Sequence, residues 1–224
     1  MENTVENKQL SRNDGNTMLC DVYHSLLRLF QGGENAYREW QSKPFVIGNN
    51  VYATDAHCIV FFEKSKVDYI APLVGYEPNN ILNLIPEERE LIPISLAEIE
   101  KAFDKSNATE KQECDACAGQ GNVHYSFYYA PEKEYYEKLH DCPICEGVGY
   151  WDRKDKVYFD IKGFRFNGNT IYKLILTASK LSQTIINISY VGTPMLFQIA
   201  DVCIVAAPCL KEDKDNEAVF LNIA

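Results

Sequence analysis

The chain has 224 residues, of which 46% are hydrophobic, and its formal net charge is −10. This length suits one large domain or two small ones with a real hydrophobic core. The acidic balance argues against a protein coated with basic surface for nucleic acid, although a local basic face on an acidic body stays open. No apolar run approaches the roughly 20 residues that span a membrane. The first residues also lack a signal-peptide pattern, so we expect a cytoplasmic protein with no membrane partner.

The first half of the chain predicts a mixture of helices and strands. Residues 1–16 are polar and are expected to form a flexible arm. Apolar residues then recur at helical spacing over 18–30, before a Gly-Gly pair that ends the helix. Residues 45–53 predict a hairpin with Gly and Asn at its turn, and a further strand follows at 58–62. The sequence Ser-Leu-Ala-Glu at 95–98 matches a capping box and predicts a short helix.

The second half returns to the same kinds of element after a cysteine-rich stretch. Its apolar patterns predict one helix, at 171–178, and five strands, which are expected at 157–161, 184–190, 195–199, 202–206 and 218–223. We therefore expect an α+β fold. Residues 17–110 and 152–224 would form two halves of one domain, and residues 111–151 would be an insert between them.

Two short segments within the insert share one cysteine pattern. Cys114-Asp-Ala-Cys117-Ala-Gly-Gln-Gly and Cys142-Pro-Ile-Cys145-Glu-Gly-Val-Gly both read C-x-x-C-x-G-x-G. Two such copies are strong evidence for a tetrathiolate zinc site, because this spacing lets both sulfurs of each pair reach one ion. Glycine permits the positive φ that the following turn needs. Four thiolates leave no open position on tetrahedral zinc, so we expect one structural Zn²⁺ rather than a catalytic centre.

The repeated motif resembles the cysteine-rich zinc domain of DnaJ-type co-chaperones over about residues 111–151. That family carries four such motifs and two zinc ions, whereas this chain has two motifs, enough for one ion. The chain has no His-Pro-Asp tripeptide and no Gly/Phe-rich linker, so the element that stimulates an Hsp70-type partner is missing. The resemblance supports the metal site and leaves a chaperone or peptide-binding role as an alternative.

Other residues near the motif, and the remaining cysteines, are expected to be structural. The 20 residues at 122–141 are rich in tyrosine, and we expect them to pack over the zinc module, with a stacking platform for bases or peptides as the alternative. His124 and His140 could replace a ligand, but four cysteines are already well placed. The other four cysteines lie in apolar contexts and are expected to be buried thiols, at positions Cys20, Cys58, Cys203 and Cys209.

The flanks of the insert resemble a DNA sliding clamp, the polymerase processivity factor. Val51-Tyr-Ala-Thr-Asp-Ala-His-Cys58 is similar to that family's strand ending in Ala-Thr-Asp-Gly-His-Arg, with Ala56 and Cys58 as departures. Ile92-Pro-Ile-Ser-Leu-Ala-Glu-Ile-Glu-Lys is similar to its step from strand to helix. Residues 169–210 resemble a clamp's last helix and three-strand meander.

The clamp resemblance implies antiparallel sheets with two helices on one side. Clamp helices contact DNA phosphates without reading sequence, and the matching basic residues here are Arg28, Lys173 and Lys180. The chain is long enough for about one clamp domain plus the insert, so a closed ring would need several copies. Duplex DNA or a protein would be the partner, and an oligomer is possible.

The common catalytic motifs are absent from the sequence. Asp55 and His57 could share a strand face as an acid–base pair, but no nucleophile accompanies them by pattern. We expect a hydrogen-bonded turn at the end of a strand instead. The sequence therefore predicts a non-enzymatic binding protein, with an enzyme using Asp55 and His57 as the least favoured alternative.

Overall fold

The computed structural model of the chain describes residues 14–33, 36, 38–72, 79–86, 90–189, 193–209 and 218–221. Most of the flexible N-terminal segment expected at residues 1–16 lies outside these ranges. No helix within the described ranges has both the length and the apolar character needed to cross a bilayer.

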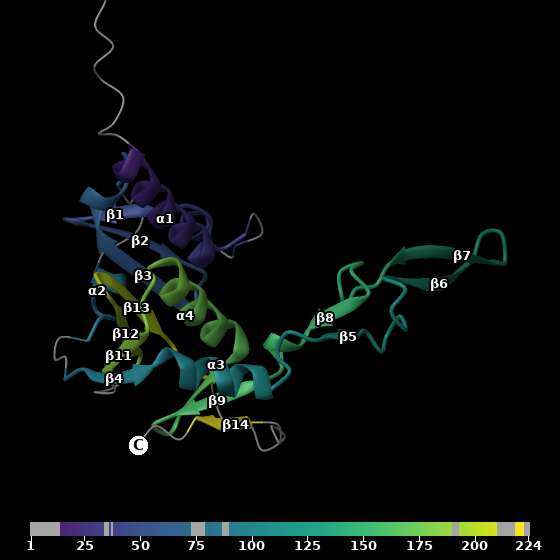
Figure 1. Cartoon of the computed structure of the whole chain (residues 1–224). Helices are drawn as coiled ribbons and strands as arrows, with labels where there is room; N and C mark the ends of the chain where they lie inside the picture. The colour runs from purple at the N-terminus through teal and green to yellow at the C-terminus, as the bar shows by residue number, and fades with distance from the viewer. Residues whose placement is uncertain are drawn as a thin grey trace, which may run out of the picture.

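A seven-stranded antiparallel sheet lies at the centre of the main body (Figure 1). The predicted hairpin and meander strands are confirmed, with Gly48 at φ +61° in the first hairpin turn. In spatial order the sheet contains β1 (Phe45–Ile47), β2 (Asn50–Thr54), β3 (Cys58–Glu63), β13 (Val202–Ala206), β12 (Met195–Ile199), β11 (Ile185–Ser189) and β4 (Ile92–Ser95).

Six of these strands are arranged symmetrically about the β3–β13 pair, and β4 extends the sheet beyond β11. Helix α1 (Asp14–Phe30) is followed by the meander β1-β2-β3, and α4 (Gly168–Lys180) is followed by the meander β11-β12-β13. The last strands of the two meanders pair antiparallel, with Val60 opposite Ile204. The two halves of the chain therefore make the same helix-and-meander unit and join into one continuous sheet.

The main hydrophobic core lies between this sheet and the helices. Alternate strand residues such as Val51, Ala53 and Val60 point to this core, because successive side chains of a strand face opposite sides. From the helices, α1 contributes Leu26 and Phe30, and α4 and α3 (Leu96–Lys105) pack against each other. Figure 1 shows α1 and α4 crossing the same face of the sheet. The expected arrangement of antiparallel strands with helices on one side is confirmed.

The two later helices begin in different ways. The side chain of Asn167 accepts a hydrogen bond from the Thr170 N–H at 2.9 Å and caps α4. At α3, Ser95 occupies the expected capping position but its side chain makes no capping bond. The Leu96 N–H instead donates to the Thr184 carbonyl at 2.8 Å, so a neighbouring segment satisfies the helix start and the predicted capping box is wrong.

Smaller elements cover the rest of the body. The opposite face of the sheet carries a second apolar cluster that includes Tyr52, Phe61 and Ile81. A three-stranded sheet lies beside α3 and α4, and in it β14 pairs parallel with β9. The elements are α2 (Asn79–Leu82), β9 (Tyr158–Ile161), β10 (Phe164–Asn167), β14 (Ala218–Leu221) and three 3-10 turns, at Glu39–Ser42, Lys64–Lys66 and Arg153–Asp155.

An elongated arm leaves the body between α3 and β9 (Figure 1). At its base β5 (Lys111–Glu113) pairs with β8 (Tyr150–Asp152), and its far end is the hairpin of β6 (Asn122–Tyr129) and β7 (Glu134–Asp141). The charged stretch Glu134–Asp141 thus forms a strand. Each pair has only two strands, and a two-stranded sheet is at best marginally stable in water by itself.

Candidate metal centre and helical face

Four buried cysteines lie where the base of the arm meets its hairpin. The sulfur atoms of the four residues lie within 4.8 Å of one another. The cysteines are Cys114, Cys117, Cys142 and Cys145. The Sγ–Sγ distances are 3.9 Å between Cys114 and Cys142 and 3.7 Å between Cys117 and Cys145. Four sulfurs bound tetrahedrally at about 2.3 Å from one zinc ion would be separated by about 3.8 Å. The donor set and its spacing therefore fit a four-coordinate metal ion.

Backbone N–H groups point at one sulfur in each motif. The Gly121 N–H donates to Cys117 Sγ at 3.2 Å, and the Gly149 N–H donates to Cys145 Sγ at 3.1 Å. Such bonds stabilise negative charge on sulfur without adding a further ligand. In both motifs, the N–H of the last glycine thus donates to the sulfur of the second cysteine.

The last glycine of each motif is required by close backbone contact between the two motifs. A Cβ atom on Gly121 would lie 2.3 Å from the Gly147 carbonyl oxygen, and one on Gly149 would lie 2.4 Å from the Gly119 oxygen. All four of these glycines have positive φ, but a Cβ on Gly119 would meet nothing closer than 3.5 Å. The turn geometry expected from the sequence explains the first glycine, and the packing of one motif on the other explains the second.

Reciprocal hydrogen bonds join the two motifs. The Cys114 N–H donates to the Gly149 carbonyl at 2.8 Å, and the Cys142 N–H donates to the Gly121 carbonyl at 2.8 Å. Because Gly121 precedes β6 and Gly149 precedes β8, these bonds bring the ends of both strand pairs to the metal centre. The centre therefore connects the base of the arm to its hairpin.

Burial and hydrogen bonds from backbone N–H groups shift the pKa values of two of the thiols in opposite directions. Burial disfavours the Cys142 thiolate, but the backbone N–H groups of Cys145 and Ile144 outweigh it and lower the pKa of Cys142 to about 7. Burial, together with the neighbouring thiols, raises the pKa of Cys145 to about 11 despite the Gly149 N–H. Since a thiolate rather than a thiol binds metal, metal binding at the centre would release protons.

The two histidines of the arm and the other cysteines do not join this cluster. His124 and His140 are exposed on the hairpin. Cys58 is buried beside Thr170, and burial raises the pKa of its thiol to about 12. Cys203 is also buried, as expected, whereas Cys20 and Cys209 are only partly buried, which corrects that expectation.

A second group of possible metal ligands, found within the described ranges, lies at the surface. Cys20 and His24 are one helical turn apart on α1, and their ligand atoms lie within 4.8 Å of each other and of the Asp68 carboxylate. His24 Nε2 is 3.9 Å from Asp68 Oδ2, but the Asp68 side chain is 90% exposed. Unlike the buried cysteine cluster, this group has no enclosed geometry.

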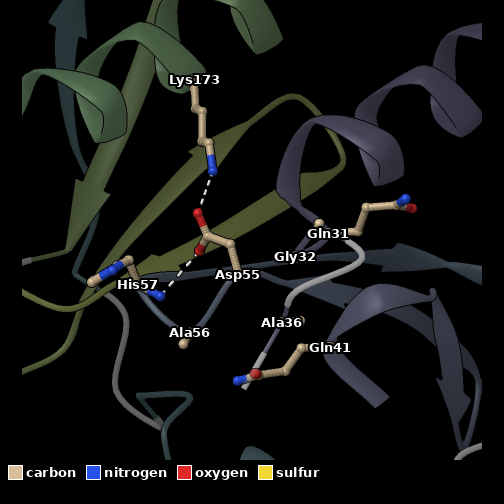
Figure 2. Close-up of a pocket in the computed structure, with 9 residues that line it drawn as sticks. Gln31, Gly32, Ala36, Gln41, Asp55, Ala56, His57 and Lys173 are labelled. Atoms are coloured by element: carbon tan, nitrogen blue, oxygen red, sulfur yellow. Dashed lines mark hydrogen bonds and ion pairs between the residues drawn. The ribbon is translucent and has the colours of Figure 1, made fainter. Parts of the chain in front are cut away.

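Asp55 and His57 form a strand-end turn, as expected. Asp55 Oδ1 accepts hydrogen bonds from the backbone N–H groups of His57 at 3.0 Å and Cys58 at 2.8 Å. Figure 2 shows the His57 ring directed away from the Asp55 carboxylate. The turn borders a cavity of about 480 Å³ that Gln31, Gln41 and Lys173 also line. The two side chains thus do not form an acid–base pair.

The three basic residues expected at DNA lie in different environments. Lys173 Nζ forms an ion pair with Asp55 Oδ2 (Figure 2), and the two side chains are only 15% and 21% exposed. Arg28, in the last turn of α1, and Lys180, at the end of α4, are exposed. The pairing of Lys173 with Asp55, 118 positions away, could not be expected from local sequence.

We expect Lys173→Met to destabilise the body by about 2 kcal/mol, because it leaves the largely buried Asp55 carboxylate without its cation. Urea unfolding monitored by circular dichroism measures the change. Lys180→Met is the matched control, and its exposed site should change the stability by less than about 0.5 kcal/mol. Adding Asp55→Asn to Lys173→Met should recover part of the loss. Equal effects of the two single lysine variants would contradict a stabilising ion pair.

Comparison with known proteins gives a consistent structural likeness at very low sequence identity. No family model matches the chain, and no curated protein matches it. The DNA polymerase sliding clamp of Caulobacter crescentus is 11% identical, with a TM-score of 0.47, over 92% of this chain and 69% of the clamp. The sliding clamp of Pseudomonas aeruginosa is 12% identical, with a TM-score of 0.45, over 84% and 64%.

A third clamp gives similar values. The DNA polymerase III β subunit of Thermotoga maritima is 9% identical, with a TM-score of 0.48, over 86% of this chain and 64% of that subunit. The chain thus spans about two thirds of the length of these clamps. Values this low describe a likeness of fold, and a function has to be argued from the chain's own residues.

Proposed function

We propose that this chain is a non-enzymatic, zinc-containing accessory protein of DNA metabolism with a clamp-like body. The observation that supports it most is the pair of equivalent helix-and-meander units, which share one antiparallel sheet with α1 and α4 on a single face. The motif at Val51–Cys58 and the step from strand to helix at 92–101 support the same assignment. In this proposal residues 17–110 and 152–224 form the body, and residues 111–151 are an inserted module.

The side of the sheet that α1 and α4 cover, here called the helical face, would bind DNA through phosphate contacts. Arg28 and Lys180 are exposed on α1 and α4, so their cations are available to phosphate oxygens. Lys173 would contribute less, because Asp55 already neutralises much of its charge. Two or three cations per chain make a weak, non-specific contact. Several copies of this chain, or a protein partner, would therefore act together on duplex DNA.

The cysteine cluster would hold one structural Zn²⁺. Zinc is the ion that four thiolates at this spacing normally bind, and four sulfurs complete its coordination. Bound zinc would supply stability rather than chemistry, because no position remains for water or substrate. The four cysteines would fix the turns of both motifs and thereby present the hairpin away from the body.

We expect the chain to bind duplex DNA weakly and with strong salt dependence. Anisotropy titrations of a labelled duplex at 50 to 200 mM salt should show log K falling linearly with log salt. Arg28→Ala and Lys180→Ala should each make the slope shallower by about 1. Lys133→Ala, in the turn of the distant hairpin, should leave it unchanged. An absence of binding at the lowest salt would remove the DNA role and leave the fold assignment standing.

The co-chaperone alternative is favoured by one observation, the exposed aromatic side chains of the hairpin. A zinc module that presents apolar surface could hold unfolded peptide. That alternative predicts suppression of aggregation of a model unfolded protein, which Cys114→Ser abolishes. Suppression without DNA binding would favour the alternative, and DNA binding without suppression would favour the clamp-like role.

A further inference from the structure

The hairpin at the end of the arm carries an exposed ladder of aromatic side chains. Directly opposite residues of an antiparallel pair lie on the same face of the sheet. Phe127 is opposite Tyr136, Tyr125 is opposite Lys138, and Tyr129 is opposite Glu134, so all six share one face. The ring centroids of Phe127 and Tyr136 are 5.8 Å apart, and those of Tyr129 and Tyr136 are 6.4 Å apart. We call these six side chains the ladder face.

The ladder face is open to solvent instead of packing over the metal centre, which corrects the expectation from sequence. Phe127 is 53% exposed, and the other aromatic residues of the face are also exposed. The hairpin itself is a sheet of only two strands, and within the described ranges no further layer covers its aromatic side. An aromatic surface of this kind on a narrow, projecting element indicates an interaction site.

The charges on the ladder face indicate which partner fits it. Residues 122–141 contain four acidic and two basic residues, a composition that repels phosphate. Along β7 the face reads Glu134, Tyr136 and Lys138, so opposite charges lie at equal distances on either side of one tyrosine. When two identical β7 strands lie face to face and run in opposite directions, Glu134 of each strand therefore lies opposite Lys138 of the other. The geometry points to a second copy of this chain as the partner of the ladder face.

A twofold axis fits the pattern. Let the axis lie in the interface, at right angles to the strands and level with Tyr136. Each β7 then lies over the β7 of the second copy in the opposite direction, so Glu134 of each copy meets Lys138 of the other. Phe127 meets its own equivalent on β6, and Tyr125 meets Tyr129 of the second copy. The contact is isologous and closed, as most homodimer interfaces are.

Charge reversal in the full-length, zinc-loaded chain tests this arrangement. Sedimentation equilibrium should show that the wild type dimerises reversibly. Glu134→Lys alone and Lys138→Glu alone each replace two attractive contacts per dimer by repulsive ones, and each should weaken dimerisation about tenfold. The double variant E134K/K138E restores both contacts and should return to within about threefold of the wild type.

A pair of aromatic variants distinguishes the two faces of the hairpin. Phe127→Ser should weaken dimerisation at least tenfold, because the residue lies at the centre of the ladder face. Tyr135→Ser is the matched control, since Tyr135 is 75% exposed and lies with Tyr128 on the opposite face. Zinc content and circular dichroism show that each variant is folded.

Three results would overturn the proposal. The first is that the wild type stays monomeric at high concentration. This includes the case in which the monomer binds single-stranded DNA or a peptide through Phe127. Another is a double charge variant no better than the single ones. The third is an equal loss from Tyr135→Ser. DNA binding by the helical face is measured separately, so either proposal can fail without the other.

Discussion

The Cys114→Ser variant is expected to lose its zinc and the folded structure of the arm while the body stays folded. The wild type should contain about one zinc per chain by elemental analysis, and the variant should contain close to none, because a serine hydroxyl does not replace a thiolate on zinc. The arm consists of two-stranded pairs joined at the cysteine cluster, so in the proposed zinc-bound chain the coordination energy would supply most of its stability. The main core contains no residue of the cluster.

Two measurements separate the arm from the body in this experiment. Limited proteolysis should cut the variant within residues 111–152, whereas the wild type is cut there only after a chelator removes the metal. The urea midpoint of the body should change little. Cys20→Ser is the control, because Cys20 lies on α1, and it should keep the metal content and the protease resistance of the arm. A folded, reduced wild type without zinc would contradict the proposed site.

The Gly121→Ala variant should weaken zinc binding by about 100-fold. The added methyl group would lie 2.3 Å from the Gly147 carbonyl oxygen, and the residue has φ +78°. Positive φ costs a non-glycine residue about 1 kcal/mol or more, and the overlap with backbone of the other motif raises the total to about 3 kcal/mol. Competition with a chromogenic chelator measures the affinity.

Gly119→Ala is the matched control within the same motif. Its φ is +77°, nearly the same, but its Cβ would meet only the Glu113 side chain, at 3.5 Å. The control therefore carries the cost of the backbone conformation without the overlap, and we expect about a tenfold weakening. If the two variants weaken zinc binding equally, the close approach of the two motifs does not explain the second glycine.

At the metal centre, the local sequence pattern predicted which cysteines cluster but not how the two motifs pack on each other. The C-x-x-C-x-G-x-G spacing predicted all four clustered cysteines, because a turn of fixed length determines which sulfurs can share an ion. It did not predict that Gly121 and Gly149 each contact the backbone of the other motif, since that contact exists only when the two copies are assembled. The same limit applies to Ser95, whose capping role is replaced by a carbonyl from another segment.

Surface and ion-pair chemistry could be predicted less well than the elements themselves. The clamp resemblance implied that Lys173 contacts DNA, and the structure places Asp55 against it from a distant turn. The tyrosines at 122–141 were expected to cover the metal, but an alternating strand of this length points half of its side chains to each face of an uncovered hairpin. Neither outcome is encoded in a window of a few residues.

The sequence by itself determined most helices and strands of the body and the four cysteines that cluster, because periodicity, turn residues and cysteine spacing act over fewer than about 20 residues. Only the tertiary structure decided three things. These are the joining of the two helix-and-meander units through β3 and β13, the Lys173–Asp55 ion pair, and the exposure of the ladder face. Each depends on which segments far apart in the chain meet, and that is decided by the packing of the whole core rather than by local propensity.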